Sequence, residues 1–142
     1  MGMPRKWRAM YRWVDHTAEL ELHVEADTER EIFLEALAAL GELLGERTEL
    51  DTAQPARHEV HASAPDGATL LAEWLGELVF LAESEGFVPE RVDELELSGD
   101  ELTATVSGRR GSPPHLVKAV TYHRLELRER EGAWRATVVL DV

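Results

Sequence analysis

Every second residue from Glu19 to Ala26 is apolar, and this alternation restricts the fold of the chain more than any other feature. One side carries Leu20, Leu22, Val24 and Ala26, and the other carries Glu19, Glu21, His23 and Glu25. A period of two is that of a strand with one face buried. The pattern therefore predicts a strand that packs one face against a core and turns the other to water.

Two segments carry apolar residues at helical spacing. Thr28 stands three residues before Glu31, which is the spacing of a capping box, and apolar residues then recur with a helical period as far as Leu44. A second periodic segment follows the turn at residues 65–67, with leucines and Trp74 on one side. We expect two amphipathic helices.

The remaining patterned segments predict strands. They lie at residues 11–14, 57–64, 92–97, 102–106, 118–128 and 134–142, with turns at 98–100 and near Gly132. The order is β-β-α-β-α followed by four strands. We therefore expect an α+β protein in which two helices pack on one face of a mainly antiparallel mixed sheet, folded as a single domain over residues 1–142.

Charge and cysteine content exclude several classes of protein. The chain has 28 acidic and 15 basic residues, a net charge of −13, which argues against strong direct binding of nucleic acid through its phosphates. The absence of cysteine excludes disulfides, iron–sulfur clusters and a thiol nucleophile. No apolar run approaches the roughly 18 residues of a membrane span. We expect a cytoplasmic protein without membrane association.

Two aspartates near the ends of the chain could form an oxygen-rich site. Asp15 follows an apolar segment, and Asp141 lies inside the apolar run 138–142, where an unpartnered carboxylate is costly to bury. If the two terminal strands are neighbours, these carboxylates and the oxygens of Val142 would suit Ca²⁺, Mg²⁺ or Mn²⁺. The spacing alone favours the alternative, in which Asp141 is solvated or hydrogen-bonded.

A second group of polar residues lies between Lys118 and His123. Lysine, threonine, tyrosine and histidine within six residues could support acid–base chemistry or bind a phosphate. On pattern alone, a strand with a polar outer face is the better interpretation. Residues 108–114, which include Arg109 and Arg110, lack the spacing of a phosphate loop and predict a mobile basic loop.

Four motifs together resemble the archease family over nearly the whole chain. They are Asp15-His16-Thr17-Ala18-Glu19, then Leu70-Leu71 with Trp74-Leu75 and Glu77-Leu78, then Val117-Lys118-Ala119-Val120-Thr121-Tyr122-His123, and finally Val139-Leu140-Asp141-Val142. The resemblance implies a protein that assists an RtcB-type RNA ligase in tRNA splicing and RNA repair. It implies help with GTP-dependent guanylylation of the ligase and with repeated turnover, and no enzyme activity of the chain itself.

The same resemblance implies which residues act. A divalent metal, calcium in the family, would be held by Asp15, Asp141 and a main-chain oxygen of Val142, and Lys118 would be functionally important. His16 and His123 lie in the same motifs and are further candidates. Glu19 stands where the family usually has aspartate, which leaves a direct metal role at this position open. The stretch around Arg109 and Arg110 also differs from the family's commoner acidic loop.

Two other functions remain as alternatives. One is a chaperone or specificity factor for a tRNA methyltransferase, which the family resemblance also suggests. The other is a small metal-dependent hydrolase using Asp15, His16, His123 and Asp141. The sequence has no nucleophile motif and too few candidate ligands for a two-metal site, which argues against the hydrolase.

Overall fold

The structure is a computed structural model that describes residues 9–46, 54–111 and 117–142. Residues 112–114 of the expected basic loop lie outside this part of the chain. The described residues form seven strands and two helices in the expected order. They are β1 (Met10–His16), β2 (Glu19–Ala26), α1 (Glu29–Glu46), β3 (Gln54–Ser63), α2 (Gly67–Glu85), β4 (Phe87–Ser98), β5 (Glu101–Arg110), β6 (Ala119–Arg130) and β7 (Ala133–Asp141).

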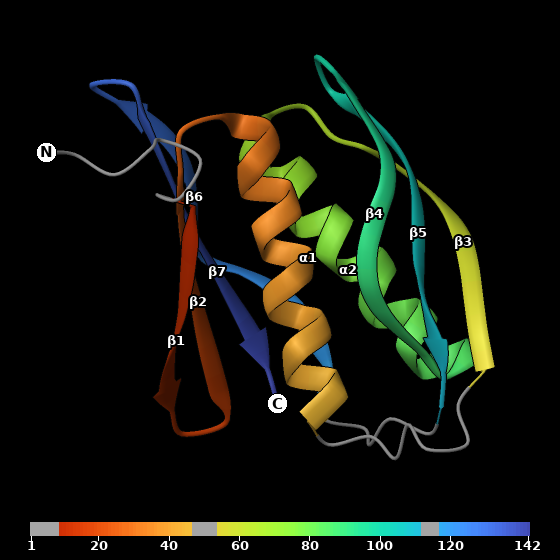
Figure 1. Cartoon of the computed structure of the whole chain (residues 1–142). Helices are drawn as coiled ribbons and strands as arrows, with labels where there is room; N and C mark the ends of the chain where they lie inside the picture. The colour runs from red at the N-terminus through yellow and green to blue at the C-terminus, as the bar shows by residue number, and fades with distance from the viewer. Residues whose placement is uncertain (1–8, 47–53, 112–116) are drawn as a thin grey trace, which may run out of the picture.

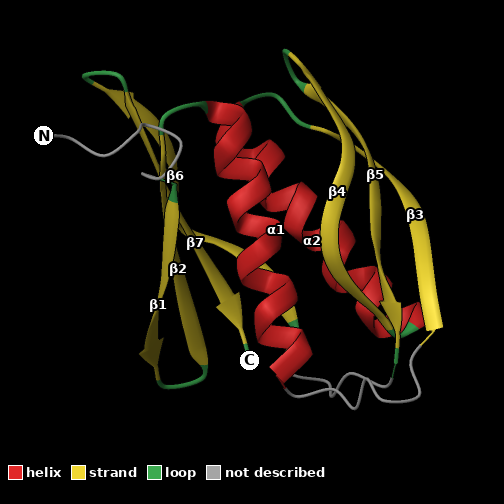
Figure 2. Ribbon diagram, viewed as in Figure 1, coloured by secondary structure: helices red, strands yellow, loops and turns green. Residues whose placement is uncertain are grey.

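The strands form two antiparallel sheets with the helices between them (Figure 1). One sheet has four strands in the order β1-β2-β7-β6, and the other has three in the order β3-β5-β4. The expected α+β class, with two helices and antiparallel strands, is confirmed. The expectation of a single sheet on one face of the helices is wrong, because the strands form two separate sheets with the helices between them (Figure 2).

Burial around the helices explains the second sheet. The buried residues of α1 include the neighbours Ala36, Leu37, Ala39 and Leu40, which point in several directions around the helix axis. A helix that is apolar around most of its circumference must be covered on more than one side. Accordingly α1 contacts β2 of one sheet and β4 of the other, and α2 contacts β6 and β3.

Side-chain caps fix where the helices begin. The Thr28 hydroxyl accepts a 3.1 Å hydrogen bond from the amide of Glu31, as the capping box predicts. The Asp66 carboxylate caps α2 by accepting a 2.8 Å bond from the amide of Thr69, which lowers the pKa of Asp66. Gly86 ends α2 in the left-handed conformation, with φ of 67°.

Trp74 joins the two helices in the centre of the core. Its side chain is fully buried, and its indole Nε1–H donates a 3.0 Å hydrogen bond to the carbonyl oxygen of Phe33 on α1. A buried indole needs such a partner, and here the partner belongs to the neighbouring helix. The bond therefore fixes how α2 packs against α1.

The expected basic loop begins later than the sequence suggested. Arg109 and Arg110 are the last residues of β5, and Arg110 is paired with β3 on one side and β4 on the other. Backbone pairing on both sides overrides the glycine and arginine content that predicted a loop. The two side chains make ion pairs, Arg109 with Glu90 at 3.1 Å and Arg110 with Glu85 at 3.3 Å.

Neither α1 nor α2 is long and apolar enough to cross a membrane.

Candidate functional site

One end of the four-stranded sheet brings three of the sequence motifs together. The β1–β2 turn is a two-residue connection in which Ala18 has a φ of 61°, and the Ala18 carbonyl accepts a 3.1 Å hydrogen bond from the amide of Val142. The amide of Lys118, just before β6, donates a 2.7 Å bond to the carbonyl of Asp141. Figure 1 shows the C-terminal label near this turn.

Asp15 and Asp141 share the sheet but do not lie on adjacent strands. Strand β2 lies between β1 and β7, so the two strands that carry the aspartates are not direct neighbours. Asp15 is paired with Leu20, whereas Asp141 is paired with Glu19, the next residue along β2. Successive side chains point to opposite faces of a sheet, so the two carboxylates start from opposite faces.

This register limits where a cation could bind. Carboxylate and main-chain oxygens are the donors that hard divalent cations prefer, so Asp15, Asp141 and Val142 fit such an ion by their chemistry. The described residues contain no group of three or more histidine, aspartate or glutamate side chains arranged to hold a metal. A cation shared by the two aspartates would therefore need a main-chain oxygen, such as that of Val142, as well.

Glu21 on β2 is the centre of a charged cluster on the outer face of this sheet. Its carboxylate lies 2.9 Å from His16 Nε2, 3.3 Å from His23 Nε2 and 3.6 Å from Arg124 Nη2. Only 13% of the Glu21 side chain is exposed. The hydrogen bond to His16 and the nearby positive groups outweigh burial and lower the pKa of Glu21.

A bulge in β6 supplies the arginine of this cluster. Between the pairs Thr121–Val139 and Glu126–Thr137, β6 has the four residues 122–125 where β7 has one. Arg124 lies in this bulge with φ of 55°, a conformation uncommon for residues other than glycine. Bulges redirect side chains. Here the Arg124 guanidinium reaches across β7 to lie 3.1 Å from Glu19.

The same bulge connects the Lys118–His123 motif to α2. The exposed Tyr122 donates its hydroxyl hydrogen to the Glu73 carboxylate on α2, and this bond raises the pKa of Tyr122. The amide of His123 bonds the Thr121 hydroxyl at 3.3 Å, and the side chains of His123 and Lys118 are exposed. The expected polar outer face is thus present, but the pattern did not predict the bulge in the backbone of this strand.

The model of the Archease protein family (MTH1598/TM1083) matches residues 11–142. The chain belongs to the archease family. It is 32% identical to the protein archease of Methanosarcina barkeri, over 93% of this chain and 95% of the relative. It is 33% identical to the protein archease of Methanopyrus kandleri, over 91% of this chain and 96% of the relative.

Solved structures agree with the archease fold described above. Protein 1598 of Methanobacterium thermoautotrophicum superposes with a TM-score of 0.67 at 26% identity, covering 93% of this chain and 98% of that one. An archease from Thermotoga maritima, described as a possible chaperone, superposes with a TM-score of 0.60 at 21% identity. It covers 94% of this chain and 98% of that one.

The sequence motifs of the archease family located part of this site and missed the rest. They include His16, Lys118 and Asp141, which the structure places at one end of the sheet. They do not include the cluster of Glu21, His23 and Arg124. The alternation in β2 already put Glu21 and His23 on one face, so their contact could have been expected, whereas nothing in the sequence announces the bulge that directs Arg124.

Proposed function

We propose that this archease-family chain is an accessory protein of an RtcB-type RNA ligase. It promotes GTP-dependent guanylylation of the ligase and repeated turnover in tRNA splicing or RNA repair. The chain does not join RNA itself in this proposal. Membership of the family supports the proposal, and so does the site at the end of the four-stranded sheet.

The observation that carries the proposal is the meeting of Lys118, Asp141 and the β1–β2 turn. The bonds from Lys118 to Asp141 and from Val142 to Ala18 use backbone atoms only. They therefore fix the positions of these residues while the Lys118 side chain stays exposed and available to a partner. An exposed ammonium group suits a contact with phosphates held in the active site of another protein.

A divalent cation belongs to this proposal. Asp15, Asp141 and a main-chain oxygen of Val142 would hold it, with Ca²⁺ expected first and Mg²⁺ or Mn²⁺ as other hard cations of suitable chemistry. When bound, the cation would supply positive charge close to the reacting phosphates of the nucleotide. Lys118 adds a second positive charge, and the contacts of Glu21 with His16 and Arg124 keep the neighbouring turn in place.

The direct test is guanylylation of the cognate ligase by GTP, measured with and without this chain. Wild type should increase the guanylylated fraction and the number of turnovers, and Asp15→Ala, Asp141→Ala and Lys118→Ala should not. Asp100→Ala is the matched control, because Asp100 is exposed in the β4–β5 turn of the other sheet. Equal stimulation by wild type and the three site variants would contradict the proposal.

A chaperone function is the second candidate, because the Thermotoga maritima archease is described as a possible chaperone. It predicts that the chain suppresses aggregation of a client such as a tRNA methyltransferase, with no requirement for Lys118. The same variants separate the two functions. If Lys118→Ala protects the client as well as wild type while the ligase is unaffected by either protein, the chaperone function is supported.

The hydrolase alternative has a test of its own. If the chain hydrolyses phosphoesters in the absence of ligase and Asp15→Ala does not, the chain is a hydrolase.

A further inference from the structure

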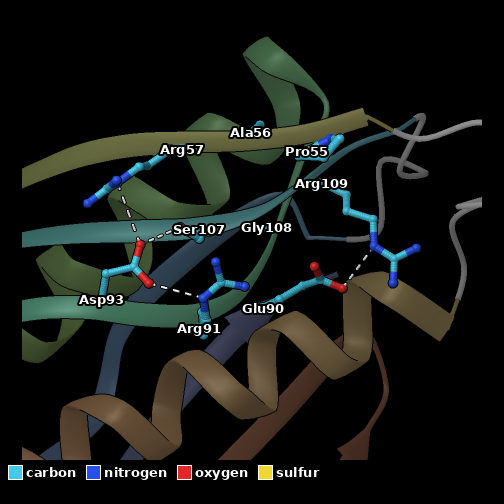
Figure 3. A pocket seen from close by; sticks show the side chains of 9 residues that line it. All are labelled: Pro55, Ala56, Arg57, Glu90, Arg91, Asp93, Ser107, Gly108 and Arg109. Carbon is cyan, nitrogen blue, oxygen red and sulfur yellow. Dashed lines mark hydrogen bonds and ion pairs between the residues drawn. The ribbon is translucent and has the colours of Figure 1, made fainter.

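An open depression of about 790 Å³ lies on the outer face of the three-stranded sheet, away from the site described above (Figure 3). Strands β3, β4 and β5 all contribute to it. Three arginines, Arg57, Arg91 and Arg109, stand around it together with two carboxylates, Asp93 and Glu90. Arginines outnumber acids on this surface, although the chain as a whole has a net charge of −13.

Two irregularities in β4 put the carboxylates on this surface. Pro89 pairs with Gly108 and Arg91 with Ser107, so Glu90 is left without a partner on β5. The second shift, between Val92 and Glu94, leaves out Asp93 in the same way. Bulges of this kind redirect side chains and are over-represented beside binding sites.

Asp93 holds two arginines in place. Arg57 on β3 and Arg91 on β4 are both paired with Ser107 on β5, so the three residues form one row across the sheet. The Asp93 carboxylate lies 3.0 Å from Nε of Arg91 and 3.6 Å from Nε of Arg57, and it accepts the hydroxyl hydrogen of Ser107. These groups lower the pKa of Asp93, Ser107 most strongly, so the carboxylate stays charged. In the described part of the chain, Ser107 is the only buried polar residue.

The third arginine is held in the same manner. Arg109 Nε lies 3.1 Å from the Glu90 carboxylate. In Figure 3 each of the arginine contacts drawn ends on the nitrogen nearest the chain, and the terminal nitrogens of Arg91 and Arg109 extend beyond it. Gly108 separates Ser107 from Arg109, and a Cβ at this position would overlap the carbonyl oxygen of Val88, so β4 crosses β5 closely here.

We propose that this depression binds the phosphate group of a small phosphomonoester. A guanidinium fixed through Nε presents its terminal N–H groups as a planar fork, which matches two phosphate oxygens. Three such groups against two carboxylates leave one positive charge for the ligand. None of the residues that line the depression is aromatic, so no base or ring stacks in it and the phosphate carries the recognition. The inference is independent of the proposed function, which uses the other sheet.

Inorganic phosphate is the first probe. Its binding is monitored by NMR, through the amide and arginine Nε resonances of the full-length chain at constant ionic strength. Saturable shifts are expected at Ser107, Gly108 and the Nε–H groups of the three arginines. The double substitution Arg57→Gln with Arg91→Gln should weaken binding by roughly tenfold or more, because it removes two charge-assisted donors. Both side chains are about two-thirds exposed, at 65% and 68%, so the variant should keep its unfolding midpoint.

A matched control separates a built site from general charge. Arg128→Gln with Arg135→Gln removes two arginines of similar exposure, 67% and 66%, on the four-stranded sheet. This variant should bind phosphate as wild type does. Equal weakening in both double variants, or shifts centred on Arg128 and Arg135, would overturn the proposal.

Two further arms test the geometry and the source of the phosphate. Arg91→Lys keeps the positive charge but loses the planar fork of guanidinium N–H groups, so this variant should bind inorganic phosphate several-fold more weakly. Binding as tight as that of wild type would contradict the proposed geometry. AMP and phosphoserine then compare a nucleotide with a phosphorylated amino acid. Saturable binding of either one supports the proposal and names the source. Binding of inorganic phosphate with no binding of either phosphomonoester overturns it.

Discussion

The amide of Lys118 donates a 2.7 Å hydrogen bond to the carbonyl oxygen of Asp141, and so joins the segment before β6 to the end of β7. Both partners are backbone atoms. The contact therefore survives substitution of either side chain. This separates the position of the two residues, which the fold determines, from the chemistry of their side chains, which a partner would use.

Lys118→Ala tests that separation. We expect loss of most of the ligase stimulation, because the exposed ammonium group is removed. The free energy of unfolding should change by no more than about 0.5 kcal/mol, as is usual for exposed side chains. Urea unfolding and the guanylylation assay check the two expectations on the same preparation. A large loss of stability would mean that the Lys118 side chain supports the fold.

Glu21→Gln tests the charged cluster through its pH dependence. The pKa of Glu21 lies below its ordinary value of 4.5, chiefly because His16 bonds the charged carboxylate. A lowered folded-state pKa stabilises the fold above the unfolded-state pKa, and this stabilisation is lost as the pH falls through the folded-state value. Wild type should therefore exceed Glu21→Gln in stability near pH 6, and the difference should shrink below pH 4.5.

Urea unfolding at a series of pH values measures this difference. Glu96→Gln is the control, because Glu96 is exposed on β4 of the other sheet and its substitution should change the free energy of unfolding by no more than about 0.5 kcal/mol. A difference for Glu21→Gln that stays constant from pH 7 to below 4.5 would show that the carboxylate charge does not stabilise the cluster.

The order of the elements could be predicted from the sequence because its signals are local. The alternation in 19–26, the capping box at Thr28 and the turn near Gly132 each act within a few residues, and the structure confirms them. The division into two sheets depends on pairing between distant strands, such as β3 with β5, and periodicity carries no information on such pairing. The apolar residues around α1 require cover on more than one side, but they do not determine which strands supply it.

The candidate site was predictable to the same extent. Motifs led to His16, Lys118 and Asp141, since their neighbours in sequence identify the family. The bulge that directs Arg124 toward Glu19 could not be predicted, because it depends on how β6 passes β7 and has no sequence signal of its own. The binding of a metal by Asp15 and Asp141 stays a prediction.

Gly41→Ala tests how closely α1 packs on β4. A Cβ at Gly41 would overlap the carbonyl oxygen of Pro89, so the helix and strand would have to move apart. We expect a loss of about 1–3 kcal/mol, the usual cost of overpacking. Gly76→Ala is the control within α2, where a Cβ meets nothing within 4 Å. It should stabilise the protein by about 0.5–1 kcal/mol through helix propensity. Equal effects of the two variants in urea unfolding would contradict this packing.

Trp74→Ala tests the junction of the helices. The substitution removes a fully buried side chain and its bond to the Phe33 carbonyl, so we expect a loss of about 3–5 kcal/mol. Phe80→Ala truncates an aromatic residue on the same helix that is 62% exposed, and it should change stability by no more than about 0.5 kcal/mol. Thermal or urea unfolding compares them. Similar losses would mean that Phe80 is covered in solution.

Calcium should stabilise the folded chain if Asp15, Asp141 and Val142 hold it. The ion would tie the β1–β2 turn to the end of β7, and unfolding would have to release it. At a free concentration of one hundred times the dissociation constant, the added stability would be about 2.7 kcal/mol. The unfolding midpoint in calcium, compared with that in chelator, measures this effect. Asp15→Ala and Asp141→Ala should lose the increase and Asp100→Ala should keep it, because Asp100 lies in the β4–β5 turn of the other sheet. An equal increase in all four proteins would place the ion away from the two aspartates.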